Sequence, residues 1–199
     1  MTSAYDTSIP PARWRLALLV LALTVFGGAA LALILALGAA NPPHAADLVL
    51  NQHSDDGLTD AGTFGGATLL AFPVELAPPF TVEMEASNSG AAGSAWGVWL
   101  RVSDHYGNLS VLPMLVDTQG YALAAVDSPA LQHHRFIHIQ RDSNRVYLHV
   151  DQNGTAVYRI NDEIFATVAL PVTTIEAAGL ALYGSPVLDW RSIKIYSGS

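Results

Sequence analysis

The sequence contains no cysteine among its 199 residues. Disulfide bonds, thiolate metal sites and a cysteine nucleophile are therefore excluded. Basic residues are scarce as well, with nine against 17 acidic residues, and Lys194 is the only lysine. Binding to nucleic acid or to anionic lipid headgroups needs a basic surface, so we expect neither of these partners.

Charged residues are missing altogether between Arg15 and Asp47. Within this gap, residues 16–40 form a run of 25 uncharged and mostly apolar residues. At about 1.5 Å per residue a helix of this length reaches roughly 37 Å, which exceeds the ~30 Å hydrocarbon core of a bilayer. The run predicts a single transmembrane helix that ends before Pro42 and Pro43, because proline cannot continue a helix.

The flanks of this helix predict its orientation. Arg13 and Arg15 precede the apolar run, and the next basic residue is Arg101. Basic flanks stay on the cytoplasmic side, so we expect a cytoplasmic N-terminus and an extracytoplasmic C-terminal domain at the cell membrane. A cleaved signal peptide is the alternative, although its apolar region is usually about 7–15 residues long.

Small residues recur every four positions along the predicted span, at Thr24, Gly28, Ala32, Ala36 and Ala40. This spacing lets a second helix approach closely, so it predicts a transmembrane partner, either a second copy or another subunit. A segment this rich in alanine also produces such a stripe by chance, and that alternative stays open.

The sequence predicts four regions. Residues 1–15 form a cytoplasmic tail, 16–40 the transmembrane helix, and 41–66 a tether and loop-rich entry with room for a first strand. Residues 67–199 form the extracytoplasmic domain. Gly, Asp and Thr dominate residues 51–66, which is typical of a loop.

Short strand-forming runs fill the outer domain, and turn signals separate them about every 8–12 residues, as in a sandwich or barrel. Arg135–Gln140 and Val146–Asp151 are expected to pair as a hairpin, and Asn153-Gly154 to form a tight turn. The fold class is therefore mainly β, an antiparallel β-sandwich preceded by one transmembrane helix. The expected strands are 68–72, 80–87, 94–103, 108–116, 121–126, 135–140, 146–151, 156–160, 179–183 and 190–196.

Several loose motifs occur in a fixed order, beginning with Gly97-Val98-Trp99-Leu100-Arg101 and continuing through Asn153-Gly154 and Asn161-Asp162 to Asp189-Trp190. In this order they resemble the concanavalin A-like, laminin-G-like jelly-roll superfamily, and most of all its bacterial modules related to family 16 glycoside hydrolases. The resemblance covers roughly residues 68–197 and implies a jelly-roll sandwich. Two departures stand out: Asn161-Asp162 replaces the usual Asn-Gly, and Asp189-Trp190 replaces the usual Phe-Asp.

The resemblance also implies a saccharide site on one sheet face. If Trp96 and Val98 face the core, Trp99 and Arg101 face the other way, and Tyr121 on a neighbouring strand can join them. An exposed Trp beside an Arg can stack on a sugar and donate hydrogen bonds to it. The alternative is that Trp99 fills a core and Arg101 is paired structurally.

Evidence for catalysis is weak. Catalytic members of the superfamily carry Glu-x-Asp-x-x-Glu on one strand, whereas this chain has Glu83-Met84-Glu85 followed by Asn88. The two glutamates share a strand face, but the third acidic position is absent. We expect a protein that is not an enzyme, with a glycoside hydrolase-like activity as the remote alternative.

Metal-binding patterns are weak too. His134, His138 and His149 lie on expected strands but do not have zinc-site spacing. Asp55, Asp56 and Asp60 in the glycine-rich loop could hold Ca²⁺ through oxygen ligands, although their spacing fits no specific calcium loop. No cofactor is expected, with Ca²⁺ as the one alternative.

These features predict a membrane-anchored, extracytoplasmic, non-catalytic binding or interaction module, with glycans as the first ligand class. An accessory subunit of a larger membrane protein complex, whose sandwich caps the outer side, is the alternative from a different class. The same sandwich architecture hosts both roles, so the fold alone does not separate them.

Overall fold

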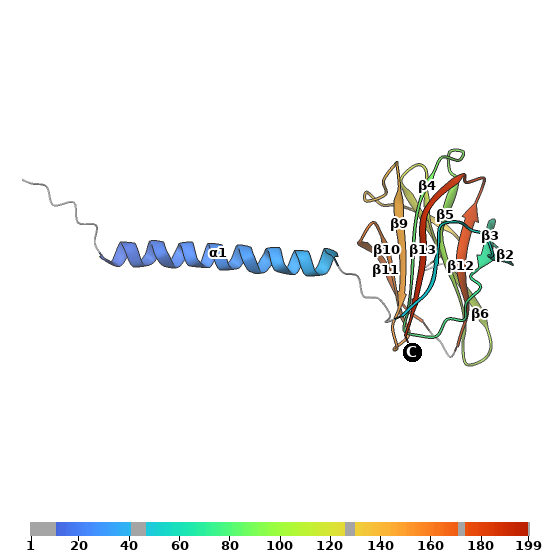
Figure 1. The fold of residues 1–199 in the computed structure, drawn as a ribbon, viewed down its shortest axis with the longest axis horizontal. Coiled ribbons are helices and arrows are strands. Elements are labelled where there is room, and N and C mark those ends of the chain that lie inside the picture. Colours follow the sequence, from blue (N-terminus) through green and yellow to red (C-terminus); the bar gives the residue numbers. More distant parts are fainter. Residues whose placement is uncertain (1–10, 41–46, 126–129, 171–173, 199) are drawn as a thin grey trace, which may run out of the picture. The chain divides into compact units, whose positions relative to one another are not determined.

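The chain divides into two units, an N-terminal helix and a β-sandwich (Figure 1). The computed structural model describes residues 11–40, 47–125, 130–170 and 174–198, and it describes the side chains of the helix for residues 14–33. Most of the expected tail and the tether at 41–46 therefore lie outside the described residues.

The helix, α1, spans Pro11–Ala40 and so begins earlier than the predicted range. Proline suits the first turn of a helix because the N–H that it lacks has no partner there. Residues Trp14–Leu33 have a mean hydropathy of 2.5. This helix is long and apolar enough to cross a membrane, and a signal sequence near an N-terminus shares these properties.

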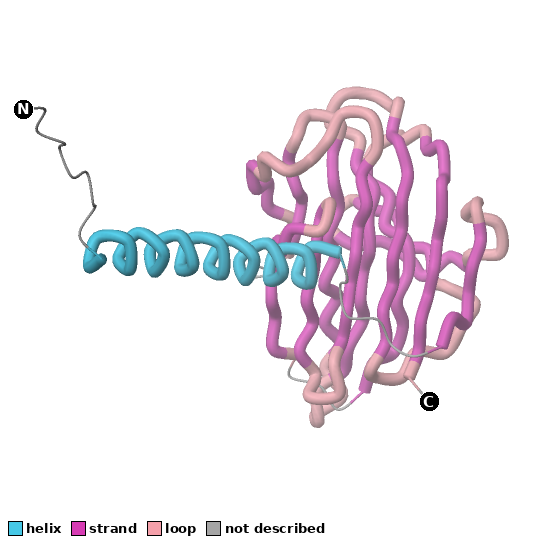
Figure 2. Tube along the Cα trace, turned by 60° about the vertical axis from the view of Figure 1, so that its left-hand side comes forward, coloured by secondary structure: helices cyan, strands magenta, loops and turns pink. Residues whose placement is uncertain are grey.

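Two antiparallel sheets stack to form the sandwich, as expected from the turn spacing (Figure 2). The six-stranded sheet contains, in spatial order, β1 (Asp47–Gln52), β13 (Leu188–Ser197), β4 (Phe80–Asn88), β9 (Asn144–Val150), β10 (Thr155–Ile160) and β11 (Glu163–Ala169). The seven-stranded sheet contains β2 (Thr59–Phe64), β3 (Ala67–Ala71), β12 (Thr174–Tyr183), β5 (Ala95–Ser103), β6 (Leu109–Asp117), β7 (Tyr121–Ala124) and β8 (Gln132–Arg135).

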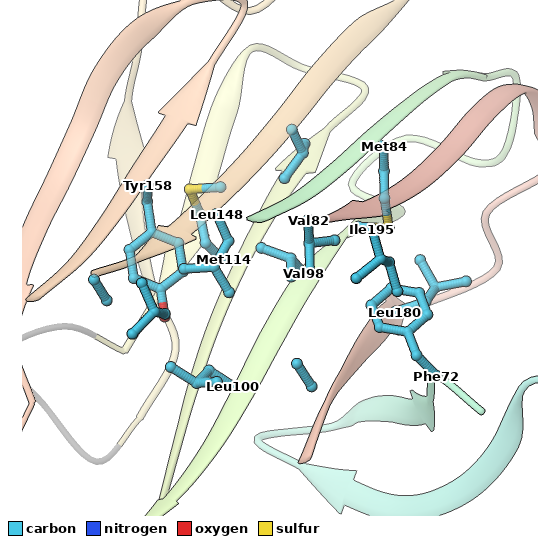
Figure 3. Packing of buried hydrophobic residues seen from close by; sticks show 14 of the residues in the cluster. Phe72, Val82, Met84, Val98, Leu100, Met114, Leu148, Tyr158, Leu180 and Ile195 are labelled. Atoms are coloured by element: carbon cyan, nitrogen blue, oxygen red, sulfur yellow. The ribbon is translucent and has the colours of Figure 1, made fainter. Parts of the chain in front are cut away.

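The main core lies between the sheets. Alternate residues of each strand point into it, because successive side chains of a strand face opposite sides. Figure 3 shows Val82 and Ile195 of the six-stranded sheet beside Val98 and Leu180 of the seven-stranded sheet, and all four are fully buried. Burial of this apolar surface stabilises the sandwich by roughly 25 cal/mol for each Å² removed from water.

A second apolar cluster covers the opposite, outer face of the seven-stranded sheet. It consists of Ala67, Leu69, Ala95, Trp99, Leu115, Leu123 and Ala181. The sheet curls around this cluster. A Cβ on Gly65, in the turn after β2, would lie 3.2 Å from the side chain of Leu131, which directly precedes β8. Since β2 and β8 are opposite edges of the sheet, this approach closes the outer face over the cluster.

Two sequence-based expectations are wrong. Residues 51–66 are not one loop, because the end of β1 and the whole of β2 lie within them. Both strands are edge strands that a neighbouring strand holds in place, and β2 contains a bulge in which Ala61, next to Gly62, is the extra residue. Pairing rather than propensity therefore stabilises them.

The predicted hairpin between 135–140 and 146–151 does not form. β8 ends at Arg135 and pairs with β7, whereas β9 pairs with β4 and β10. Phe136 and Ile139 both pack against the main core, and the N–H of Ile139 donates to the carbonyl of Phe136. Two apolar residues three positions apart are typical of a turn. The apolar composition of the segment had instead predicted a strand. The strand β11 was not predicted at all.

The turn between β9 and β10 carries a pH-dependent contribution to stability. The backbone N–H groups of Thr155 and Asn153 each donate to Asp151 Oδ1 at 2.8 Å, and these hydrogen bonds hold the pKa of Asp151 below its ordinary value of 3.8. A folded-state pKa below the unfolded value stabilises the fold above the unfolded pKa, and the contribution is lost as the pH falls through the folded pKa. Asp151→Asn keeps the acceptor oxygen without the charge, so we expect a shallower loss of stability below pH 3.8 in acid titration monitored by circular dichroism. An unchanged acid profile would contradict this.

Candidate functional site

The predicted stacking residue Trp99 is not exposed. Its side chain has 0% exposure in the second cluster, and its Nε1 donates to the carbonyl of Leu70 at 3.1 Å. The indole lies over Gly179, because a Cβ there would come within 2.7 Å of Nε1. The expectation of an exposed tryptophan is therefore wrong. The curled seven-stranded sheet covers this face, and the alternation of residues along one strand does not reveal that cover.

Arg101 lies beside Trp99, as expected, with its guanidinium 5.2 Å from the centre of the indole ring. Its Nη2 donates to the carbonyl of Ala61 at 2.9 Å, so it ties β5 to β2. Tyr121 lies elsewhere: its N–H donates to Asp117, the residue that pairs with Ala95. Ala95 and Arg101 are six residues apart on β5, a separation of roughly 20 Å. The structure thus brings two of the three residues together, and ligand binding by Arg101 or Tyr121 stays a prediction.

The other predicted sites stay predictions too. The side chains of Ala36 and Ala40, in the small-residue stripe, lie outside the described residues. Within the described part of the stripe, the hydroxyl of Thr24 donates to the carbonyl of Val20 at 2.9 Å. Over residues 14–33, 47–125, 130–170 and 174–198, no group of three or more His, Asp or Glu residues could hold a metal ion. The carboxylates of Asp56 and Asp60 accept hydrogen bonds from Ser54 and Gly62, respectively.

A polar pocket of about 330 Å³ lies on the outer face of the six-stranded sheet. Its volume falls within the range of small-molecule sites. All of its lining residues have polar side chains: Glu85, Gln140, Ser143, Arg145, Asn161, Asp162 and Arg191. A second pocket of about 480 Å³ shares Gln140 and continues past Arg141 to the β6–β7 turn. Hydrogen-bonding groups therefore converge in the polar pocket from three strands and two turns.

A β-bulge places Arg191 in this pocket. The pairing of β13 with β4 shifts between Trp190 and Ser192, so Arg191 is the extra residue. Trp190 packs edge-on against Trp96 in the core at a centroid distance of 5.4 Å, whereas the Nη1 of Arg191 donates to Glu85 Oε1 at 2.9 Å. Bulges recur beside binding sites because they re-aim a side chain without ending the strand.

The turn between β10 and β11 supplies the opposite wall. Asn161 and Asp162 have φ angles of 50° and 73°, the left-handed conformation that usually selects glycine. Asn161 accepts the N–H of Arg145 and donates to His138 and Asn144, so it fixes the turn. Asp162 uses its position to form an ion pair with Arg145. A carboxylate therefore occupies a strained position where glycine would fit without strain.

The charges of the pocket are paired. Arg145 also lies 3.6 Å from Glu83, and Ser143 Oγ donates to Glu85 at 3.4 Å. Burial acts to lower the pKa of Arg145, but the hydrogen bond and charge of Asp162 outweigh it and leave that pKa above its ordinary value. The neighbouring Tyr147 is almost fully buried, which raises its pKa to about 12. Arg145 therefore stays charged and Tyr147 stays neutral at neutral pH.

Sequence reasoning found only part of this site. It placed Glu83 and Glu85 on one outward face of β4, and both lie there beside arginines. Arg145, Arg191 and Gln140 were missed, because residues far apart in the chain meet only through strand register. The one signal was Asn161-Asp162, which the sequence showed as a departure from Asn-Gly.

No protein-family model matches the sequence, and no curated protein matches it. Solved structures with a similar fold include a protein of unknown function with a galectin-like fold from Bacillus subtilis, at 8% identity and a TM-score of 0.49 over 77% of this chain and 97% of that chain. The carbohydrate-binding module CBM66 from Bacillus subtilis is 12% identical, with a TM-score of 0.43 over 78% and 97% of the two chains. LamAcat from Zobellia galactanivorans is 10% identical, with a TM-score of 0.43 over 66% and 68%.

Proposed function

We propose that this protein is a membrane-anchored, extracytoplasmic and non-catalytic binding module, and that its polar pocket binds a hydroxyl-rich ligand, a glycan. The resemblance of the sequence motifs to the concanavalin A-like superfamily supports this proposal. The single observation that carries the proposal is the composition of the pocket, in which two carboxylates, two guanidinium groups and two amides converge on about 330 Å³.

Sugar hydroxyls both donate and accept hydrogen bonds. The pocket offers both kinds of partner side by side, since Glu85 and Asp162 accept whereas Arg191 and Gln140 donate. Hydrogen bonds to charged groups are the stronger ones, with a net contribution of about 1.5–3 kcal/mol each. A few such contacts are enough to hold one end of a glycan.

The pocket is pre-organised. The side chain of Asn144 accepts from the N–H of Gln140 and donates to its carbonyl, both at 2.8 Å, and it also accepts from Asn161 at 2.8 Å. This network connects the turn before β9 to the turn after β10. Because the walls are already ordered, little conformational entropy is lost when a ligand binds.

The flanks of α1 support the membrane placement. Arg13 and Arg15 precede the apolar residues, which predicts a cytoplasmic N-terminus and puts the sandwich on the other side of the membrane. A glycan-binding pocket is useful on that side, where cell-surface polysaccharides are found. Retention of the full apolar segment is testable by comparing the mass of the mature protein with that of the encoded chain.

The glutamates of β4 support a binding role over catalysis. A retaining glycosidase uses two carboxyl groups that flank the scissile bond, one of them as a proton donor. Here Glu85 pairs with Arg191 at 2.9 Å, and Glu83 is nearly buried and lies 3.6 Å from Arg145. Both carboxylates serve as ion-pair partners within the pocket wall.

Asp162→Gly is expected to separate binding from stability. Glycine adopts the φ of 73° without strain, and this gain offsets the lost, partly exposed ion pair with Arg145. The free energy of unfolding should therefore change by less than about 1 kcal/mol. Glycan binding should fall at least about tenfold, because an acceptor is lost and Arg145 is left without its closest partner. Chemical denaturation and a glycan array, both with full-length protein in a detergent without a sugar headgroup, measure the two effects.

Asp55→Gly is the matched control, since it makes the same change of charge in the exposed loop after β1. It should leave array binding unchanged. Binding that survives Asp162→Gly, or an array without any bound glycan, would overturn the proposed function.

The accessory-subunit role remains the second prediction, and the small-residue stripe through Thr24, Gly28 and Ala32 motivates it. Gentle solubilisation from the native membrane, followed by mass measurement, separates the two functions. A stable hetero-complex favours the subunit role, whereas a lone monomer or homodimer favours the binding module.

A further inference from the structure

We propose that the ligand of the polar pocket is an uncharged saccharide that is recognised through the positions of its hydroxyl groups, without an aromatic stacking platform. This inference rests on the proposed function and narrows its ligand class. Three observations carry it: the internal pairing of the arginines, the unused acceptor oxygens, and the absence of aromatic rings from the lining.

Both guanidinium groups of the pocket already have counter-charges. Arg191 pairs with Glu85, and Arg145 pairs with Asp162 and lies near Glu83. An anionic ligand would therefore meet arginines whose charge neighbouring carboxylates already balance. Arg159 adjoins this group, because its Nη1 donates to the carbonyl of Asp162 at 3.2 Å, so three arginines face three carboxylates and the local formal charge is 3 − 3 = 0.

The net charge of the rest of the chain also disfavours anionic ligands. Outside residues 1–15 the chain carries 7 basic and 16 acidic residues, a formal charge of 7 − 16 = −9. Arg141 lies in the adjoining pocket and does not line the polar pocket itself. A net negative field lowers the local concentration of anions and leaves that of neutral molecules unchanged.

The unused hydrogen-bonding capacity of the pocket suits hydroxyl groups. Glu85 receives hydrogen bonds at Oε1, and Asp162 pairs with Arg145 through Oδ1. Over the described residues no hydrogen bond reaches Oε2 of Glu85, Oδ2 of Asp162 or the side-chain amide of Gln140. Two carboxylate oxygens need donors, which a hydroxyl supplies and an ionised carboxyl or sulfate group does not.

No aromatic side chain lines the pocket. The ring of Tyr147, on β9, is almost fully buried beneath Arg159, whose guanidinium carbon lies 5.9 Å from the ring centre. The apolar face of a sugar ring therefore finds no stacking partner in the lining. A site that relies on hydrogen bonds rejects an analogue that lacks one of the hydroxyls it reads, because its own polar groups are then left unpaired.

Matched saccharide pairs test the inference. Full-length protein in a zwitterionic detergent without a sugar headgroup is titrated calorimetrically with disaccharides in which a hexose is replaced by the corresponding hexuronic acid, as in galactobiose and digalacturonate. In the pair that contains the tightest-binding saccharide, we expect the neutral disaccharide to bind at least about tenfold more tightly than its uronate counterpart. Its affinity should depend little on salt. Removal of the hydroxyl group at one or more positions of the bound sugar, as in its deoxy analogues, should lower the affinity at least about tenfold.

Glu85→Gln sharpens the test. It removes the counter-charge of Arg191 and makes the pocket more positive by one unit, so the preference for the neutral member should shrink or reverse. Glu75→Gln changes the net charge of the chain equally, but Glu75 lies in the exposed segment between β3 and β4 and should leave the preference unchanged.

The outcomes distinguish the two levels of the proposal. Tighter, salt-sensitive binding of the uronate by the unsubstituted protein overturns the neutral-ligand inference and leaves glycan binding standing. Equal affinity for all deoxy analogues overturns recognition through hydroxyl positions. Binding of no saccharide above the level of Asp162→Gly overturns the proposed function itself, and the inference with it.

Discussion

Replacing Trp99 with alanine is expected to lower the free energy of unfolding of the sandwich by about 3–5 kcal/mol. The side chain has 0% exposure and packs in the second apolar cluster, on the outer face of the seven-stranded sheet. Its removal leaves a cavity, because Gly179 beneath it has no side chain to move into the gap. It also leaves the carbonyl of Leu70 without the indole donor. Chemical denaturation of the full-length chain, followed by circular dichroism in the strand region, measures the loss.

Two comparison variants make this result interpretable. Trp96→Ala removes the other fully buried tryptophan, from the main core, and should cost a similar amount. Trp99→Phe keeps most of the apolar area and loses the hydrogen bond, so a loss of about 1–2 kcal/mol is expected. A change below about 1 kcal/mol for Trp99→Ala would show that this face is open in solution, and would restore Trp99 as an exposed stacking residue.

Gly179→Ala is expected to destabilise the domain by about 3–5 kcal/mol, an unusually large effect for one methyl group. A Cβ at this position would lie 1.8 Å from the carbonyl oxygen of Leu70 and 2.7 Å from the Nε1 of Trp99. The first atom belongs to the backbone of β3, so the strand itself would have to shift. Gly97 has a similar constraint, with the carbonyl oxygen of Met114 at 2.0 Å from its would-be Cβ.

Gly107→Ala is the control for the loss of a glycine as such. Gly107 has a φ of 80° in the exposed turn after β5, and nothing lies within 4 Å of its would-be Cβ. Strain of the left-handed conformation alone should cost about 1–2 kcal/mol. Equal losses for the two substitutions would mean that the close approach of β12 to β3 is not maintained in solution.

The two outer faces of the sandwich thus differ in role. Glycines on β5 and β12 let the seven-stranded sheet curl tightly, and its outer face becomes a second core around Trp99. The outer face of the six-stranded sheet stays polar and carries the pocket with Arg145 and Arg191. A tightly packed cluster has no room for a ligand, whereas a face with unused acceptor oxygens does. This difference directs the search for a ligand to the six-stranded sheet.

Local pattern determined much of this protein. The uncharged run at 16–40 predicts the apolar helix, because length and hydropathy are properties of a single segment. Alternation within strands, together with turn residues such as Asn153-Gly154, predicts most strands of a sandwich. The alternation also places Trp99 and Arg101 on the face opposite to Val98, and it places Glu83 and Glu85 together on one side of β4.

Only the tertiary structure decided which of those faces is open. The cover over Trp99 depends on the approach of Gly65 to Leu131, two residues from opposite edges of one sheet. The polar pocket joins Glu85 to Arg191, 106 residues away, through strand register and a bulge. Edge strands such as β2 form despite poor propensity because a neighbour supplies their hydrogen bonds. Side-chain periodicity is encoded locally, whereas burial and convergence depend on contacts between distant segments, and these exist only once the sheets have curled and stacked.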